Sequence, residues 1–439
     1  MKDLLSKLNV SRRQVLGMIS AGTAGLLLPG KIQAAAAQTK AKSVIQIWMW
    51  GGPCHIDTFD PKPDAGYDFC GPLNKAIASN VDGIQLGDSL PLLAKMADKY
   101  SIIRSMTHGQ NGHETASYMM QTGRMSGGLV HPCIGAVVSY CKGYAAGYKS
   151  MIPPYIVITR PQGRFSEAGF LGMRYKPFAT GGNPADKRFA VEGIVSKDVT
   201  PERQINRRSL LEKLDMLEKA APQDQTVALA KKHKEEAWEL ILGSAGKVFD
   251  LNDEKPELRE EYGNNPFGQA CLVARRLAES GVPYITINYE GWDTHKQHFI
   301  LMRTKMPQLD KGMSTLLRDL ENRGLLDSTL VWWGGEFGRT PRVQWEAPWN
   351  GGRNHFGKVF SVVLAGGGIK GGRVVGSTNA TGEEVKDRPV YPWDLTGTLY
   401  QLMGIRPDFT VKGPQGQDIR ITPGPEEKLT SGGYLRELV

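Results

Sequence analysis

The sequence is poor in cysteine and lacks long apolar stretches. Five of its 439 residues are cysteine, too few for a scaffold built on a disulfide framework. Two alternatives stand for Cys54 and Cys70, a disulfide or two free thiols, and the other three cysteines fit small buried hydrophobic positions. Beyond the N-terminal segment no run of about 18 apolar residues occurs, so no membrane-spanning helix is predicted there.

Several motifs that mark common enzyme classes are also missing. No CxxC pair and no HExxH sequence is present, which argues against zinc fingers and zinc metalloproteases. No GxSxG elbow and no P-loop occur, which argues against serine hydrolases and nucleoside triphosphatases.

A concentrated block of one charge is missing as well. The formal net charge is +9, but residues 1–37 carry +4 of it. In the remainder, Lys and Arg are interspersed with Asp and Glu, and no basic patch is evident. Nucleic acid is therefore not predicted as a partner.

The N-terminus resembles a twin-arginine export signal. Arg12 and Arg13 precede an apolar run from Val15 to Leu28, and small residues follow from Ala34 to Ala37. The run is shorter than the roughly 20 residues that span a bilayer, and the alternative is an amphipathic first helix. We expect residues 1–37 to be a leader recognised by the twin-arginine export machinery and cleaved after Ala37. The mature protein would then be periplasmic or secreted, without a stable membrane anchor.

The apolar pattern predicts alternating strands and helices, which is typical of an α/β fold with a mostly parallel sheet covered on both faces. Alternating Lys, Glu and apolar residues predict a helical insertion at about 198–250. The predicted domain is 38–439. Strands are expected at 43–50, 101–103, 154–159, 284–288, 329–333 and 359–365, and helices at 90–100, 114–121, 265–280, 309–323 and 394–403.

Polar residues gather where the predicted strands end or begin. Six of the eight histidines lie in these places, the exceptions being His131 and His233. Because strand ends meet at one edge of an open α/β sheet, Asp, Glu and His there resemble an oxygen and nitrogen metal site. Each residue singly also fits a cap, a turn or a core hydrogen bond. The metal-ligand candidates are Asp57, Asp293, His295, His298, Glu336 and His355, and the catalytic candidates are His113, Thr115 and Arg339.

Several segments resemble the alkaline phosphatase and sulfatase superfamily in the same order. One reads QLDKGMSTLLRDLENRGLLDSTLVWWGGEFG, and two later ones read VVLAGGGIKGGRVVG and RPVYPWDLTGTLYQLMGI. LPLLAKMADKYSIIRSM and the run from His113 to Arg124 are similar to the approach to the nucleophile and its helix. Within the superfamily the sequence resembles the family named domain of unknown function 1501, which shares the GGPxHxDxFD and GWDTH segments. The resemblance implies an alkaline-phosphatase-like α/β/α sandwich.

The departures from that superfamily concern its site. His113 stands where a sulfatase has the residue converted to formylglycine, so that chemistry is not expected. Glu336-Phe337 replaces a metal-binding Asp-His pair, and Gly51-Gly52 replaces a carboxylate pair, with Asp57 the nearest carboxylate.

The remaining ligand positions of the superfamily are partly kept. Asp293 and His298 are five residues apart rather than four, with His295 as a second candidate. His355 falls where the last histidine ligand is expected.

The first functional hypothesis is a metal-dependent hydrolase of phosphate or sulfate esters. Asp293, one of its two following histidines and His355 would hold one divalent metal, for which zinc is favoured and calcium, magnesium and manganese are alternatives. Asp57 and Glu336 would hold a second ion or orient ligands.

The catalytic candidates have graded roles under this hypothesis. His113 would be a nucleophile, a general acid or base, or a ligand, and Thr115 is a weaker nucleophile candidate. Arg339 would bind the anionic ester, the alternative being a salt bridge to Glu336 or a surface charge.

Under this hypothesis the expected substrate is a small-molecule or polysaccharide ester. Trp345 and Trp349 could stack on a sugar, or they could close their loop by packing. The second hypothesis is a non-catalytic exported binding or envelope protein on a degenerate form of the fold. The lost ligands favour it, and the retained histidines oppose it.

Overall fold

The computed structural model describes residues 40–161, 167–191, 193–195, 199–214, 220 and 223–439. The predicted leader at 1–37 lies outside the described residues. No helix of the described part is long and apolar enough to cross a membrane.

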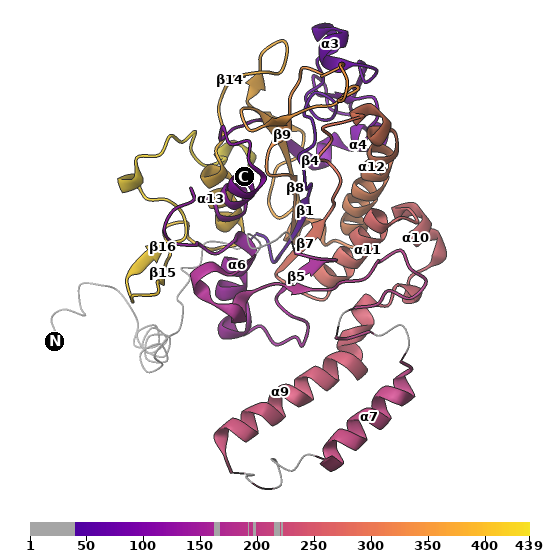
Figure 1. The fold of residues 1–439 in the computed structure, drawn as a ribbon, viewed down its shortest axis with the longest axis vertical. Coiled ribbons are helices and arrows are strands. Elements are labelled where there is room, and N and C mark those ends of the chain that lie inside the picture. The colour runs from indigo at the N-terminus through magenta and orange to yellow at the C-terminus, as the bar shows by residue number, and fades with distance from the viewer. Residues whose placement is uncertain (1–39, 162–166, 192, 196–198, 215–219, 221–222) are drawn as a thin grey trace, which may run out of the picture. The chain divides into compact units, whose positions relative to one another are not determined.

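An eight-stranded sheet forms the centre of the fold (Figure 1). Every neighbouring pair is parallel except the two that involve β11, which runs antiparallel to β4 and to β8. The predicted mixed α/β fold with a mostly parallel sheet is therefore confirmed. In spatial order the strands are β12 (Arg373–Val375), β4 (Tyr100–Met106), β11 (Phe360–Ala365), β8 (Thr329–Gly334), β1 (Ser43–Trp48), β7 (Tyr284–Asn288), β5 (Tyr155–Ile158) and β6 (Phe178–Ala179).

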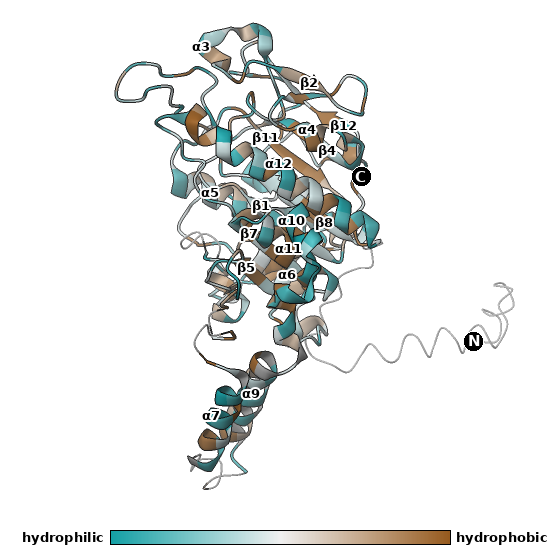
Figure 2. Ribbon diagram, turned by 90° about the vertical axis from the view of Figure 1, so that its right-hand side faces the viewer, coloured by the Kyte–Doolittle hydropathy of each residue, from teal (hydrophilic) through white to brown (hydrophobic). Residues whose placement is uncertain are grey.

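Both faces of the sheet are buried because its strands are apolar on both sides. Alternate residues of β1 enter different cores: Ile45 and Ile47 enter one, and Val44 and Trp48 enter the other. Such continuous apolar strands are typical of parallel sheets covered by helices. One core is closed by α11 (Pro266–Glu279) and α12 (His298–Asn322), and the other by α6 (Ile134–Lys142) and α13 (Pro392–Leu402). Figure 2 colours the apolar residues of the sheet and its covering helices brown.

The helical insertion consists of two helices. α7 (Pro201–Leu214) and α9 (Gln225–Leu242) pack against each other, as Figure 1 shows. α9 continues into a 3-10 helix, Ser244–Phe249, which packs on α11. The insertion is therefore joined to the sheet layer through the residues that follow α9.

Two helix predictions need correction, and one helix was not predicted. The expected helix at 90–100 is only one turn, α4 (Pro91–Ala94), followed by a 3-10 turn, and β4 begins at Tyr100. Leu90, Leu93 and Ala97 are buried as their spacing predicted, but burial alone does not keep the backbone helical. α12 begins at His298 rather than at 309, and α6 was not predicted because its β-branched residues favour strands.

All five cysteines are buried free thiols, so the disulfide alternative for Cys54 and Cys70 is not realised.

The remaining elements are short. The short elements are α3 (Tyr67–Cys70), α5 (His113–Thr122), α10 (Pro256–Tyr262), β2 (Ala76–Ala78), β3 (Gln85–Gly87), β9 (Gly338–Arg339), β10 (His355–Phe356), β13 (Ser377–Thr378), β14 (Val385–Asp387), β15 (Thr410–Lys412) and β16 (Asp418–Arg420).

Candidate metal centre

The antiparallel direction of β11 explains why residues that follow β1, β7 and β8 meet residues that precede β11. β1, β7 and β8 run in the same direction, so the loops that follow them leave from one edge of the sheet. β11 runs the opposite way, so the loop that precedes it reaches the same edge. The short pairing of β9 with β10 then places His355 opposite Arg339.

Backbone contacts hold the loop after β7 against the loop before β11. Arg353 N–H donates to Thr294 O at 3.1 Å, and His298 N–H donates to Gly351 O at 3.1 Å. Gly352 lies directly on the backbone of His295, where a Cβ would come within 1.8 Å of the carbonyl oxygen. A side chain at 352 would force the two loops apart.

Gly51 makes a similar close approach after β1. Its φ is +103°, a conformation that favours glycine, and a Cβ there would lie 2.1 Å from Asp293 N. The Gly51-Gly52 pair, which the sequence comparison treated as a lost carboxylate pair, lets the loop carrying Asp293 lie on the end of β1.

Asp293 is the centre of a cluster of imidazoles. His113 Nε2 lies 3.3 Å from Asp293 Oδ2, and His355 Nε2 lies 3.1 Å from Oδ1. One ligand atom from each of these three residues lies within 4.8 Å of the others. His295 joins the cluster, with Nε2 2.8 Å from His355 Nε2 and 3.1 Å from Asp293 Oδ1.

Each imidazole of the cluster has an oxygen acceptor at its other nitrogen. Nδ1 of His113 lies 2.7 Å from the Glu336 carboxylate, and Nδ1 of His355 lies 2.7 Å from the Asn111 carbonyl oxygen. Nδ1 of His295 lies 3.1 Å from Asn354 Oδ1. Because these oxygens accept hydrogen bonds, they favour a proton on each Nδ1, which leaves Nε2 as the nitrogen that can either bind a cation or carry a second proton toward Asp293.

The carboxylates give the cluster its charge. Burial by itself raises the pKa of Asp293, but hydrogen bonds from His113 and His355 and the charge of Arg339 hold this pKa far below its usual range. Burial lowers the pKa of His113, but hydrogen bonds to Asp293 and Glu336 outweigh it and raise the pKa to about 9. A proton on His113 and the charge of Arg339 together offset the two carboxylates.

Arg339 is buried on the inner side of the cluster, next to Asp293. Its side chain is fully buried, it pairs with Asp293, and it donates to the carbonyl oxygens of Gly51 at 2.8 Å and Arg353 at 3.0 Å. Arg339 was expected to bind an anionic ester, and the structure places its guanidinium inside the protein, on Asp293 and two carbonyl oxygens. The salt-bridge alternative describes it better, with Asp293 rather than Glu336 as the partner.

Glu336 lies beneath His113. Its Oε1 accepts from Gly51 N–H at 2.9 Å as well as from His113, and its buried Oε2 has no hydrogen-bond partner among the described residues. Phe337, which stands in place of the expected imidazole, stacks on His355 with centroids 4.5 Å apart. Trp50 stacks on His113 at 5.2 Å.

Asp57 and His298 lie in a separate buried network. His298 Nε2 lies 2.7 Å from Asp57 Oδ2, its Nδ1 lies 2.7 Å from the Thr294 hydroxyl, and Arg353 donates to Asp57 Oδ1 at 2.9 Å. Both side chains are about 1% exposed. The structure does not bring these two ligand candidates into the Asp293 cluster, because their polar atoms are already paired.

The remaining candidates from the sequence are Thr115, Trp345 and Trp349, and of these described residues only Trp349 contacts a histidine of the cluster. Thr115 is half-buried in the first turn of α5, and no hydrogen bond joins it to the cluster among the described residues. Trp345 packs between Tyr67 and Phe299, which closes its loop, whereas Trp349 lies beside His295 with centroids 6.4 Å apart.

Sequence reasoning missed the acceptors Asn111 and Asn354. Asn354 could have been found, since it directly precedes His355. Asn111 acts through its backbone carbonyl, which carries no sequence signal.

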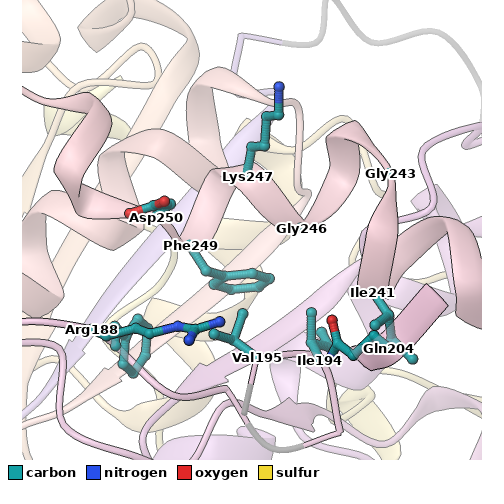
Figure 3. A pocket seen from close by; sticks show the side chains of 11 residues that line it. Arg188, Ile194, Val195, Gln204, Ile241, Gly243, Gly246, Lys247, Phe249 and Asp250 are labelled. Atoms are coloured by element: carbon teal, nitrogen blue, oxygen red, sulfur yellow. The ribbon is translucent and has the colours of Figure 1, made fainter. Parts of the chain in front are cut away.

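A pocket of about 230 Å³ lies elsewhere, at the base of the helical insertion (Figure 3). Phe249 and Val195 contribute apolar surface to it, and Arg188 reaches along its floor. None of its lining residues belongs to the Asp293 cluster.

Comparison with known proteins identifies the family. Residues 41–431 match the model of a family described as protein of unknown function, DUF1501. The chain belongs to the DUF1501 family. The family predicted from the GGPxHxDxFD and GWDTH segments is thus confirmed. No curated protein matches the sequence.

Solved structures overlap this DUF1501 protein only loosely. Ps i-CgsB in complex with k-i-k-neocarrahexaose is 13% identical, with 84% of this chain and 72% of that chain covered and a TM-score of 0.40. The lipoteichoic acid synthase LtaP from Listeria monocytogenes is 9% identical, with 88% and 75% covered and a TM-score of 0.38. A protein in the alkaline phosphatase superfamily from Vibrio parahaemolyticus is 12% identical, with 90% and 72% covered and a TM-score of 0.36. TM-scores this low transfer neither an activity nor a site.

Proposed function

We propose that this DUF1501 protein is a metal-dependent hydrolase of phosphate or sulfate esters. The observation that carries the proposal is the convergence of imidazole Nε2 atoms on Asp293, each ring having an acceptor at Nδ1. Imidazoles that ligate metals commonly donate their other N–H in this way. Asp293 is 39% exposed and His295 is 34% exposed on their side chains, so a substrate can reach them.

The donor set fits a late transition metal. His113, Asp293 and His355 would hold the ion, and His295 offers a further nitrogen. Nitrogen-rich sets suit zinc, whereas magnesium and calcium prefer oxygen ligands. We therefore favour zinc and place calcium, magnesium and manganese behind it. A bound zinc ion supplies Lewis acidity toward an ester oxygen.

The protein's own residues prepare this site. Glu336 holds the proton of His113 on Nδ1, which leaves Nε2 free to bind. Arg339 holds Asp293 in place and offsets its charge. The half-buried indoles of Trp50 and Trp349 flank the outer imidazoles and would contact an organic part of the substrate, such as a sugar.

The cellular setting is part of the proposal. Arg12, Arg13 and the apolar run after them support twin-arginine export to the periplasm or beyond. The segments similar to the alkaline phosphatase and sulfatase superfamily support ester hydrolysis. The nucleophile position held by His113 argues against the formylglycine reaction.

Metal analysis of the purified mature protein tests the proposal. We expect about one transition-metal ion per chain, its loss in His113→Ala, and its retention in His131→Ala, a histidine outside the cluster. Aryl phosphates, phosphodiesters and aryl sulfates with added zinc, manganese or calcium then test activity. Absence of bound metal in the unaltered protein would favour the non-catalytic alternative.

A further inference from the structure

A second pocket lies near the C-terminus, away from the cluster. It encloses about 400 Å³, within the range of pockets that hold small ligands. It is formed by the first turn of α13, by Arg420 at the end of β16 and by the segment 422–436. None of its lining residues belongs to the Asp293 cluster or to the buried network of Asp57.

The lining carries three cations with no carboxylate at ion-pair distance among the described residues, although Arg420 lies near enough to Asp408 to add to the lowering of that carboxyl's pKa by Arg406. Arg420, Lys428 and Arg436 form no ion pair among the described residues, and the buried Nε of Arg420 has no hydrogen-bond partner there. By contrast, Arg406 pairs with Asp408, and Arg388 pairs with Glu437. Unpaired cations that share one pocket favour an anionic ligand.

The single carboxylate in the lining does not cancel these charges. Asp394 accepts from Tyr391 N–H at 3.0 Å, from Gly432 N–H at 2.9 Å and from the Ser431 hydroxyl. Its oxygens are therefore committed to capping α13 and to holding the segment at 431–432. The cations remain available to a ligand.

The rest of the lining is apolar and aromatic. Trp393 and Tyr434 line the pocket together with Leu429 and two prolines. The Trp393 indole is held in place by its N–H bond to Thr430 O at 3.0 Å and by stacking on Tyr391. A fixed aromatic surface beside unpaired cations suits a ligand with a ring and an oxyanion.

We propose that this pocket binds an organic phosphate or sulfate ester, with the oxyanion on Arg420, Lys428 and Arg436 and the ring against Trp393. The site is separate from the metal centre and does not depend on the proposed hydrolysis. It would hold a charged group of a substrate chain or of a small effector at a distance from the reaction.

Titration calorimetry on the EDTA-treated full chain tests this proposal, because metal removal separates it from the proposed function. Phenyl phosphate is the probe, with inorganic phosphate as the ring-free comparison and phenyl sulfate as the singly charged one. We expect phenyl phosphate to bind most tightly, and we expect its affinity to fall as salt is added. Equal affinity for inorganic phosphate would overturn the role of the ring.

Variants locate the binding. The double variant Lys428→Gln/Arg436→Gln removes two exposed charges without opening the core, and we expect about tenfold or greater weakening. The matched control Arg406→Gln removes a surface arginine and should leave affinity unchanged. Undiminished binding in the double variant, or no binding of phenyl phosphate to the unaltered protein, would overturn the proposal.

Discussion

The loop at 293–298 supplies histidines to two groups of opposite character. His295 reaches the Asp293 cluster, whose side chains are partly exposed and whose imidazole Nε2 atoms converge. Three residues later, His298 reaches Asp57, where both ring nitrogens and both carboxylate oxygens have partners and almost no surface is exposed. The same residue types thus make a site open to a ligand and a closed structural network.

The two groups differ in how a buried arginine contacts the aspartate. Arg353 satisfies Asp57 Oδ1 and also donates to the carbonyl oxygen of Phe69, while His298 satisfies Oδ2. In the cluster, Arg339 contacts Asp293 from behind and leaves its outer side to the imidazoles. A carboxylate surrounded by fixed donors holds a structure together, whereas one with a solvent-facing side keeps room for an ion.

Breaking the closed network should have the largest effect. We expect Arg353→Leu to lower the free energy of unfolding by about 3–5 kcal/mol, because Asp57 is left buried without its cation. Urea unfolding near neutral pH measures this change. Arg406→Leu, which breaks an exposed pair, should cost about 0–1 kcal/mol. Similar losses in both variants would contradict the distinction.

Breaking the open cluster should affect metal binding rather than folding. We expect His355→Ala to weaken zinc affinity by about 100-fold or more. Loss of a residue that only orients a ligand already weakens metal binding by about 10- to 100-fold, and His355 is a proposed ligand itself. The side chain is 20% exposed, so stability should change little. Competition titration with a zinc chelator measures the affinity, and His131→Ala is the control. A loss of folding without a change in affinity would move His355 to the structural group.

His108, which belongs to neither group, allows a test through the pH dependence of stability. His108 Nε2 donates to Glu336 O at 2.7 Å, and its Nδ1 accepts from Gln110 N–H at 3.0 Å, so protonation would break the second bond. Burial lowers the pKa of His108 to about 4. In the unfolded chain this pKa is higher, so the unfolded state binds the proton first and stability falls as pH drops from about 6.5 toward 4.

The size of this pH effect is measurable. We expect His108 to contribute about 1–2 kcal/mol of lost stability between pH 7 and pH 5. Urea unfolding of the unaltered protein and of His108→Gln at both pH values isolates the contribution. A variant with the same pH dependence as the unaltered protein would show that His108 is not responsible.

The smallest expected effect concerns the residue behind the metal centre. Glu336→Gln keeps an oxygen that accepts from His113 but removes the charge, and we expect zinc affinity to fall about tenfold. Glu336→Ala should cost more, because His113 loses its orienting partner. The same chelator titration measures both. Equal effects of the two substitutions would mean that packing rather than hydrogen bonding is responsible.

Local pattern was enough to predict most of the sheet. The runs at 43–50, 284–288 and 329–333 are apolar and β-branched, and each is a strand with nearly those bounds. The pattern failed at 90–100, where helical spacing of buried residues accompanies a single turn and a 3-10 turn. Helix α6 was missed because burial on the sheet, rather than helix propensity, stabilises its β-branched residues.

The site was only partly predictable, for a related reason. Strand-end placement predicted that Asp293, His295 or His298, Glu336 and His355 would lie together, with Asp57 and His113 facing the same cleft. In the structure, ligand atoms of His113, Asp293 and His355 lie within 4.8 Å of one another, whereas Asp57 pairs with His298 in a separate buried network. Spacing left His295 and His298 equivalent. It also gave no sign that Arg339 faces inward, because the sequence does not show which side of β9 packs on Gly51.

The sequence by itself determined the α/β class, the family and the residue types available at the sheet edge, because these follow from apolar periodicity and short motifs. Tertiary structure decided how those residues are divided. The reversed strand β11 brought His355 to the edge, close packing at Gly51 and Gly352 joined the loops, and buried Arg353 closed one carboxylate while Asp293 stayed open. Burial and the position of a counter-charge depend on contacts between distant segments, which no local pattern encodes.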